Sequence, residues 1–160
     1  MTNASQILAW APHRTEELMR KAMSGTLNQL STDDWEVLIS KSEYRRYTFN
    51  DVILVQGAVG EALFIITDGE VRVERSDANG TWQLARLGSG AVFGEMSMLD
   101  KSGATANVVA DGQVEILTVS GPVLEALAAA DLGFAARFYK SLATTLSRRL
   151  RATNEIVRGR

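Results

Sequence analysis

The most informative stretch of the chain is Gly90-Ala91-Val92-Phe93-Gly94-Glu95-Met96-Ser97-Met98-Leu99, and Thr105 and Ala106 follow it closely. A short glycine-flanked turn that enters a helical turn gathers backbone N–H groups, which bind anions well. An acidic side chain at the mouth of such a turn can accept a hydrogen bond from a sugar hydroxyl. The pattern therefore predicts a site for a sugar phosphate. The residue where a cation would complete that site is Ala104.

The composition is that of one ordinary globular domain. Of 160 residues, 46% are hydrophobic, and the formal net charge of -2 gives no general reason to expect binding to nucleic acid or to a membrane surface. The chain has no cysteine, which excludes disulfides and thiolate metal ligands. It has no apolar run long enough to span a membrane and no signal-peptide pattern at its start, so we expect a cytoplasmic protein.

Catalytic and metal chemistry lack candidate residues. The single histidine, His13, lies in the N-terminal segment, far in sequence from the quoted stretch. Neither a histidine-held metal nor a nucleophile with a histidine base can be assembled here. A mechanism that uses carboxylates alone stays open, although nothing in the sequence points to one. We therefore expect a protein that is not an enzyme, with no catalytic residue, no metal site and no cofactor.

Helical patterns lie at both ends of the chain. Residues 1–25 are predicted to be a detached helical extension. Ser31 is a good N-cap for a second helix, Ser120 caps a short third one, and Asp131 can cap a long last helix. The apolar face of the N-terminal extension consists of Ile7, Leu8, Trp10, Leu18 and Met23.

The central part of the chain changes to short alternating or fully apolar runs separated by glycines. Asn79-Gly80 between two alternating runs is a strong hairpin signal. Many short strands with frequent turns favour an antiparallel roll or barrel. The expected strands cover residues 52–55, 62–67, 71–74, 82–87, 107–110 and 114–119.

A series of short motifs extends over this region: Gln56-Gly57, Gly60, Phe64-Ile65-Ile66, Gly69-Glu70-Val71, Phe93-Gly94-Glu95-Met96, Leu99 and Thr105-Ala106. In this order they resemble the cyclic nucleotide-binding domain family, from about residue 30 to residue 155. Residues 146–155 also resemble the long dimerising helix of bacterial regulators of the catabolite activator type. The resemblance implies a mainly β fold: an eight-stranded antiparallel β-roll of jelly-roll type, with N-terminal helices and a long C-terminal helix.

The resemblance also implies a phosphate-binding cassette over residues 94–106. Gly94 and the N–H groups after it, including that of Met96, would face the cyclic phosphate. Glu95 would accept a hydrogen bond from the ribose 2'-hydroxyl, with Ser97 close by. Taken alone, Glu95 also fits a solvated carboxylate in the first turn of a helix.

Further binding residues follow from the same resemblance. Thr105, followed by Ala106, matches the hydroxyl beside the phosphate, and it fits a β-branched strand residue equally well. Thr153 and Asn154 match the pair that reaches the purine, partly from the opposite subunit. Without a nucleotide, these two residues are expected to be exposed helix positions.

The resemblance has one departure, because Ala104 takes the place of the arginine that pairs with the phosphate in family members that bind cyclic nucleotides. Losing one member of a buried, hydrogen-bonded charge pair costs about 2 to 5 kcal/mol, or roughly 30- to several-thousand-fold in affinity. Lys101 and Arg86 are the candidates for a replacement cation, although lysine lacks the bidentate fork of arginine. We therefore expect weak or altered binding of cyclic AMP or cyclic GMP, the possible ligands.

The last helix carries an apolar stripe and a basic surface. The stripe favours a homodimer through this helix, because a long helix at a chain end needs a cover, although such stripes often belong to a protein's own core. The basic residues are more typical of a solvated face than of a nucleic-acid patch. Since the chain stops at Arg160, we expect no DNA-binding domain. The stripe consists of Phe138, Leu142, Leu146 and Leu150.

The expected organisation has three parts: a helical extension over residues 1–25, a β-roll over residues 26–130 and a dimerisation helix over residues 131–160. Two functions fit this organisation. The first is a non-catalytic regulatory module that senses a cyclic nucleotide or a related anionic ligand and converts its binding into movement of the last helix. The second is a ligand-free module for dimerisation or for binding a protein partner, which Ala104 favours.

Overall fold

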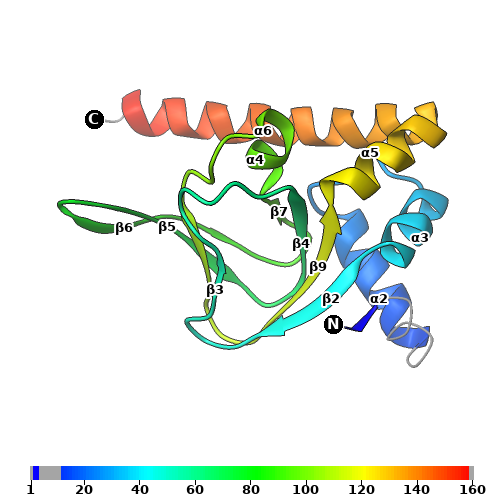
Figure 1. Cartoon of the computed structure of the whole chain (residues 1–160), viewed down its shortest axis with the longest axis horizontal. Coiled ribbons are helices and arrows are strands. Elements are labelled where there is room, and N and C mark those ends of the chain that lie inside the picture. The colour runs from blue at the N-terminus through cyan, green and yellow to red at the C-terminus, as the bar shows by residue number, and fades with distance from the viewer. Residues whose placement is uncertain (1, 4–11, 159–160) are drawn as a thin grey trace.

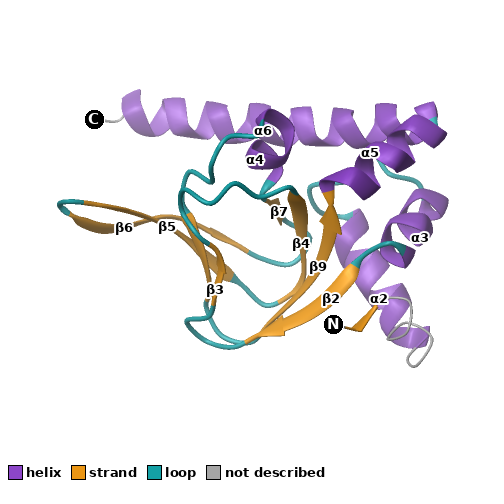
Figure 2. Ribbon diagram, in the orientation of Figure 1, coloured by secondary structure: helices purple, strands orange, loops and turns teal. Residues whose placement is uncertain are grey.

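The computed structural model describes residues 2–3 and 12–158. Two antiparallel sheets form a β-roll, and a long last helix crosses the top of the molecule in Figure 1. Figure 2 shows the strands gathered below that helix, with other helices along one side. Apart from the short N-terminal strand Thr2–Asn3, the described part of the chain has eight strands, all in the roll. The expected fold is therefore confirmed.

The first sheet contains, in spatial order, β1 (Thr2–Asn3), β2 (Glu43–Tyr47), β9 (Val114–Ser120), β4 (Ala62–Asp68) and β7 (Val92–Phe93). Phe64 of β4 lies opposite Phe93 of β7. Their rings stack with centroids 4.8 Å apart. This cross-strand aromatic pair stabilises the register directly before the cassette.

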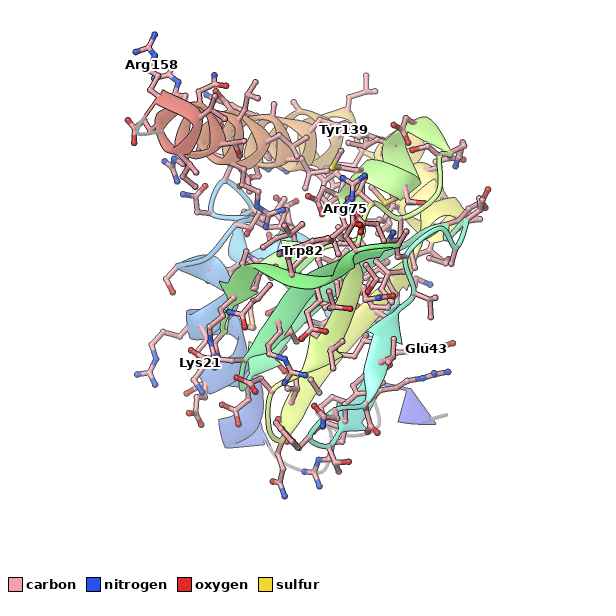
Figure 3. The ribbon with its side chains drawn as sticks, turned by 90° about the vertical axis from the view of Figure 1, so that its left-hand side faces the viewer. Lys21, Glu43, Arg75, Trp82, Tyr139 and Arg158 are labelled. Carbon is pink, nitrogen blue, oxygen red and sulfur yellow. The ribbon has the colours of Figure 1, made fainter. Side chains whose placement is uncertain are left out.

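The second sheet contains, in spatial order, β3 (Val52–Leu54), β8 (Asn107–Ala110), β5 (Val71–Asp77) and β6 (Gly80–Leu87). Strands β5 and β6 form the hairpin that Asn79-Gly80 predicts, and it projects away from the roll in Figure 1. Arg75 of β5 lies opposite Trp82 of β6, on the side of the molecule that faces the viewer in Figure 3.

Two strands of the roll were not predicted from the sequence. The residues of β2, EYRRY, show no apolar alternation, and only its two tyrosines are partly buried. This strand forms because it pairs along its whole length with the buried strand β9. Strand β7 has two residues, which is too short for any period to be recognised.

The core has two parts, one on each face of the first sheet. Leu63 and Ile65 of β4 belong to the cluster that packs against the helices, whereas Ile66 belongs to the cluster inside the roll. This division follows from the alternation of side chains along a strand. Trp35 and Phe138 are fully buried in the helix-side cluster, so the helices are part of the fold and not an addition to it.

Helix α3 spans Thr32–Ser40, α4 spans Glu95–Asp100, α5 spans Gly121–Ala130 and α6 spans Leu132–Arg158. The three predicted caps are confirmed. The hydroxyl of Ser31 accepts a hydrogen bond from the Asp34 N–H at 3.2 Å. The side chain of Ser120 caps α5, and a carboxylate oxygen of Asp131 accepts from the Phe134 N–H at 3.1 Å.

The N-terminal segment contains α2 (Pro12–Met23), but residues 2–3 form a strand where helix was expected. The segment is also not detached, and this expectation is wrong. Met19 is buried in the helix-side cluster, and the Thr26 N–H donates to the carbonyl oxygen of Gly90 at 2.9 Å. A Cβ on Gly25 would overlap that same carbonyl, so the backbones touch at this point. Of the predicted apolar face, Ile7, Leu8 and Trp10 lie outside the described residues.

A partly buried ion pair connects the start of α6 to α3. Arg137 donates from Nε and Nη2 to the two carboxylate oxygens of Asp34, at 2.6 and 2.8 Å. Asp34 also accepts from the Ser31 N–H at 2.9 Å. These bonds, that from Arg137 first, lower the pKa of Asp34 from 3.8 to about 2. The first turns of α6 are thus held in place by a bidentate pair as well as by apolar packing.

Candidate ligand-binding site

A cavity of about 130 Å³ lies where the cassette, the second sheet and α6 meet. Both ends of the predicted cassette line it, so the structure brings these residues together around one space. Their roles toward a ligand stay predictions. The cavity is lined by Leu54, Val73, Leu87, Phe93, Gly94, Glu95, Met96, Ser97, Ala104, Thr105, Ala106, Val108 and Arg149.

Gly94 forms the turn into α4 with a left-handed φ of 82°. A Cβ at this position would lie 2.8 Å from the carbonyl oxygen of Ala62 and 2.9 Å from the ring of Phe64. Glycine is therefore required both by the backbone conformation and by the close approach of β4. The turn that presents the N–H groups of the cassette depends on this residue.

The hydroxyl of Ser97 is engaged within the protein. Its Oγ lies 3.0 Å from the carbonyl oxygen of Gly60 and 2.5 Å from that of Ser102, and it accepts from the Gly60 N–H at 3.3 Å. Ser97 thus connects the loop before β4 with the loop after α4. Its neighbour Met96 is exposed beside the cavity.

The far end of the cassette presents a methyl group to the cavity, at the position where the resemblance predicts a cation. Ala104 is buried, and its N–H donates to the Ala58 carbonyl oxygen at 2.9 Å. Its own carbonyl oxygen accepts from the Gly57 N–H at 2.7 Å. These two bonds pair the segment with the loop after β3. Thr105 is exposed and Ala106 is buried.

Glu95 is bound by a residue that sequence reasoning did not place in the site. Arg149 of α6 donates from Nη1 to Oε1 of Glu95 at 2.6 Å, and from Nη2 to the carbonyl oxygen of Val92 at 2.7 Å. The Glu95 side chain is 5% exposed and that of Arg149 is 36% exposed. The carboxylate expected to accept from a ribose hydroxyl is therefore already paired with a guanidinium at the cavity wall.

A signal for Arg149 was present in the sequence. It follows Leu142 by seven residues, and this spacing places both side chains on one face of a helix. Since Leu142 is buried against the roll, a residue two turns further on the same face also points toward the roll. Without the path of the helix, nothing showed that it passes over Glu95.

The two predicted replacement cations do not line the cavity, and both have partners elsewhere. Lys101 lies 3.7 Å from Glu61 and 3.8 Å from Glu125. Arg86 pairs with Glu70 at 2.9 Å and with Asp111. The geometry therefore supports neither candidate as the replacement cation.

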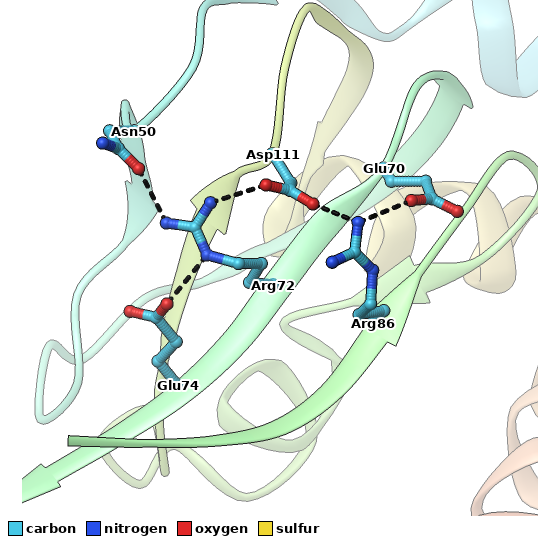
Figure 4. Close-up of polar contacts among 6 residues, drawn as sticks. All are labelled: Asn50, Glu70, Arg72, Glu74, Arg86 and Asp111. Carbon is cyan, nitrogen blue, oxygen red and sulfur yellow. Dashed lines mark hydrogen bonds and ion pairs between the residues drawn. The ribbon is translucent and has the colours of Figure 1, made fainter.

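Arg86 belongs to the charged network shown in Figure 4. At its centre, Arg72 donates to Glu74, Asp111 and Asn50, each at 2.8 Å. The hydrogen bond from Arg72, followed by the charge of Arg86, lowers the pKa of Asp111. The network joins β5 and β6 to the loops before β3 and after β8, which gives it a structural role.

Thr153 and Asn154 do not join the cassette within one chain. The Thr153 hydroxyl donates to the carbonyl oxygen of Arg149 at 3.0 Å, and both residues are exposed. Asn154 lines a separate surface hollow with Arg151, Glu155 and Arg158. A contribution of the pair to the opposite subunit's site stays a prediction.

The predicted apolar stripe of the last helix is divided. Phe138 and Leu142 are 1% and 2% exposed, so they belong to the core of their own chain and are not free for a partner. Leu146 is half-buried. Leu150 is 63% exposed, so only the distal end of the stripe is open.

No helix in residues 12–158 is long and apolar enough to cross a membrane. Within the described parts of the chain, no group of three or more histidine, cysteine, aspartate or glutamate side chains could hold a metal ion.

Comparison with known proteins gives relatives of more than one kind, among them Glutaminase 2 of Bradyrhizobium diazoefficiens, which is 33% identical over 129 residues, or 80% of this chain and 20% of that protein. The sequence model of the family described as "Cyclic nucleotide-binding domain" matches residues 44–131. The Cyclic AMP receptor protein of Thermus thermophilus is 35% identical over 91 residues, which are 56% of this chain and 42% of that protein. Cyclic GMP-binding protein C of Dictyostelium discoideum is 29% identical over 125 residues, which are 78% of this chain and 5% of that protein. The chain thus spans less than half the length of these curated relatives.

A solved structure of a cyclic nucleotide-binding domain is also similar to this chain. The crystal structure of a cyclic nucleotide-binding domain from Methylobacillus flagellatus has a TM-score of 0.80 and 25% sequence identity to this chain. The match covers 89% of this chain and 82% of that one, so the similarity includes the helices as well as the roll.

Proposed function

The chain belongs to the cyclic nucleotide-binding domain family, and we propose that it is a non-catalytic regulatory module that binds a cyclic nucleotide in the cavity beneath α6. One observation carries this proposal. Both ends of the cassette line a single cavity, together with the buried carboxylate of Glu95 and the guanidinium of Arg149. A cavity that holds an acceptor for a sugar hydroxyl and a cation for a phosphate suits a nucleotide.

We further propose that ligand binding moves the distal part of α6. The cavity of about 130 Å³ is smaller than the range of about 300 to 1,000 Å³ that is typical of small-molecule sites. In this proposal a ligand enlarges the cavity, and the side chain that closes one wall is that of Arg149. A ribose hydroxyl that donates to Glu95 competes with Arg149 for this carboxylate, so binding acts on the helix.

A homodimer through the distal part of α6 remains part of the proposal. Leu150 and Val157 are exposed and lie seven residues apart on one helix face, with Ile156 beside them. The same surface would allow Thr153 and Asn154 to reach a partner's site. The cytoplasmic location stays a prediction.

The ligand-free interaction module is the second candidate. Its support is that the Glu95–Arg149 ion pair satisfies both charges without any ligand. In this alternative, the pair is a fixed structural contact between cassette and helix.

Calorimetric titration of the purified chain with cyclic AMP, cyclic GMP and a cyclic dinucleotide tests the proposal. We expect saturable binding of at least one of them, with 5'-AMP as the control that lacks the cyclic phosphate. Heats of dilution only, for all three ligands at high micromolar concentrations, would favour the ligand-free module.

A further inference from the structure

On the basis of the proposed function, we infer that Arg149 of α6 supplies the positive charge that Ala104 leaves out of the cassette. The ligand's phosphate is then neutralised by the last helix and not by the cassette itself. Sequence reasoning did not single out Arg149. In this inference Arg149 takes the role for which Lys101 and Arg86 were the candidates.

The position of Arg149 supports the assignment. Among the described residues that line the cavity, it is the one lysine or arginine. Its two bonds, to Glu95 and to the Val92 carbonyl, use one N–H from each terminal nitrogen. A guanidinium carries five N–H donors, so donors are left for another acceptor. Its side chain is 36% exposed and is therefore not closed off from an incoming anion.

The charge balance of the cavity requires such a residue. Glu95 is buried, and most of the other lining side chains are apolar. A phosphate placed near the carboxylate would add a second negative charge in a region of low polarity, which is unfavourable without a cation. A planar guanidinium can donate to two oxyanions at once, which a lysine cannot do with the same geometry.

The other candidates are committed outside the cavity. Lys101 lies near Glu61 and Glu125, and Arg86 pairs with Glu70 and Asp111. To bind the ligand, either side chain would have to leave its present ion pair and move to the cavity, which it does not line. Arg149 already lies at the wall.

Calorimetry on Arg149→Gln tests the inference, with cyclic AMP and cyclic GMP as probes. We expect the affinity of the ligand that binds the wild type to fall by about tenfold or more, the usual effect of removing one partner of a desolvated charge pair. The matched control is Arg148→Gln, which removes the same charge from the neighbouring exposed position and should change affinity less than about twofold. Circular dichroism and thermal unfolding confirm that each variant is folded, and Arg149→Met, which also removes the charge, replaces Arg149→Gln if that variant does not fold.

The double variant Ala104→Arg/Arg149→Gln separates charge supply from a structural role. If Arg149 pairs with the phosphate, an arginine at position 104 should recover most of the lost affinity. It should also increase affinity more in this background than in the wild type, because the two guanidinium groups serve the same phosphate.

Each other outcome is decisive. Unchanged binding by Arg149→Gln overturns the inference and leaves the proposed function intact. A loss that Ala104→Arg does not recover shows that Arg149 acts by holding Glu95 or α6, which also overturns it. No binding by the wild type overturns the inference together with the proposed function.

Discussion

Replacing Asp34 with asparagine should lower the free energy of unfolding by about 2 kcal/mol at pH 7 and should remove part of the protein's sensitivity to acid. The carboxylate is buried and accepts two hydrogen bonds from Arg137 and one from the Ser31 N–H. Asparagine keeps the shape and one acceptor oxygen, but its NH2 group cannot accept, so the change removes the charge together with at least one of these hydrogen bonds. The variant also loosens the attachment of α6, the helix that carries Arg149.

The magnitude follows from the pKa of Asp34, which is lowered from 3.8 to about 2. At about 1.4 kcal/mol per pKa unit, this difference corresponds to roughly 2 kcal/mol at neutral pH. Because the pKa is lower in the folded state, the stabilisation is complete above pH 4 to 5 and is lost as the pH falls through 3.8 toward 2. About 1 kcal/mol of it should be gone at pH 3.

Urea denaturation at pH 7 and pH 3 measures the effect. We expect the difference in unfolding free energy between wild type and Asp34→Asn to shrink by about 1 kcal/mol between the two pH values. Asp33→Asn is the matched control, because Asp33 is exposed in the same first turn of α3. If the wild type and Asp34→Asn lose stability in parallel between pH 7 and pH 3, the pKa of Asp34 is not lowered and the reasoning is refuted.

Three further predictions concern the site and the last helix. Ala104→Arg should increase cyclic-nucleotide affinity about tenfold in calorimetry, and Glu95→Ala in that background should weaken binding again. If the wild type and Ala104→Arg both bind with the same negligible affinity, the site does not exist. Gly94→Ala should lower the free energy of unfolding by about 2 kcal/mol, because the left-handed backbone and the contact with β4 both exclude a Cβ, and an unchanged urea midpoint would contradict this. Leu150→Asp should convert a dimer to a monomer in light scattering without changing the circular dichroism spectrum, whereas a wild type that is monomeric at high micromolar concentration would rule the dimer out.

Local signals were sufficient for most of the fold. Ser31, Ser120 and Asp131 cap their helices as predicted, because a cap depends on residues within one turn. Asn79-Gly80 closes its hairpin for the same reason. Strand β2 was missed because its stability comes from the buried strand β9, which lies about 70 residues away in sequence.

The candidate site was predicted only where it is local in sequence. Residues 94–97 and 104–106 were singled out together, and both segments line the cavity. Arg149 was missed because its position depends on the angle at which α6 crosses the roll, and that angle is set by buried contacts of Phe138, Leu142 and Arg137. The presence of Lys101 and Arg86 near the cassette in sequence did not predict which acidic partners they would find.

The two halves of α6 are held by different forces, and this difference gives the Glu95–Arg149 pair its importance. Every buried residue of the helix lies between Phe134 and Leu142. Beyond Leu142, Arg149 donates to Glu95 and to the Val92 carbonyl oxygen, about 18 Å along the helix from Arg137. An apolar core cannot be displaced by a small ligand, whereas one partner of an ion pair can be competed for. A ligand that takes Glu95 or draws Arg149 toward its phosphate therefore acts on the distal half of α6 and leaves the proximal half fixed to the core.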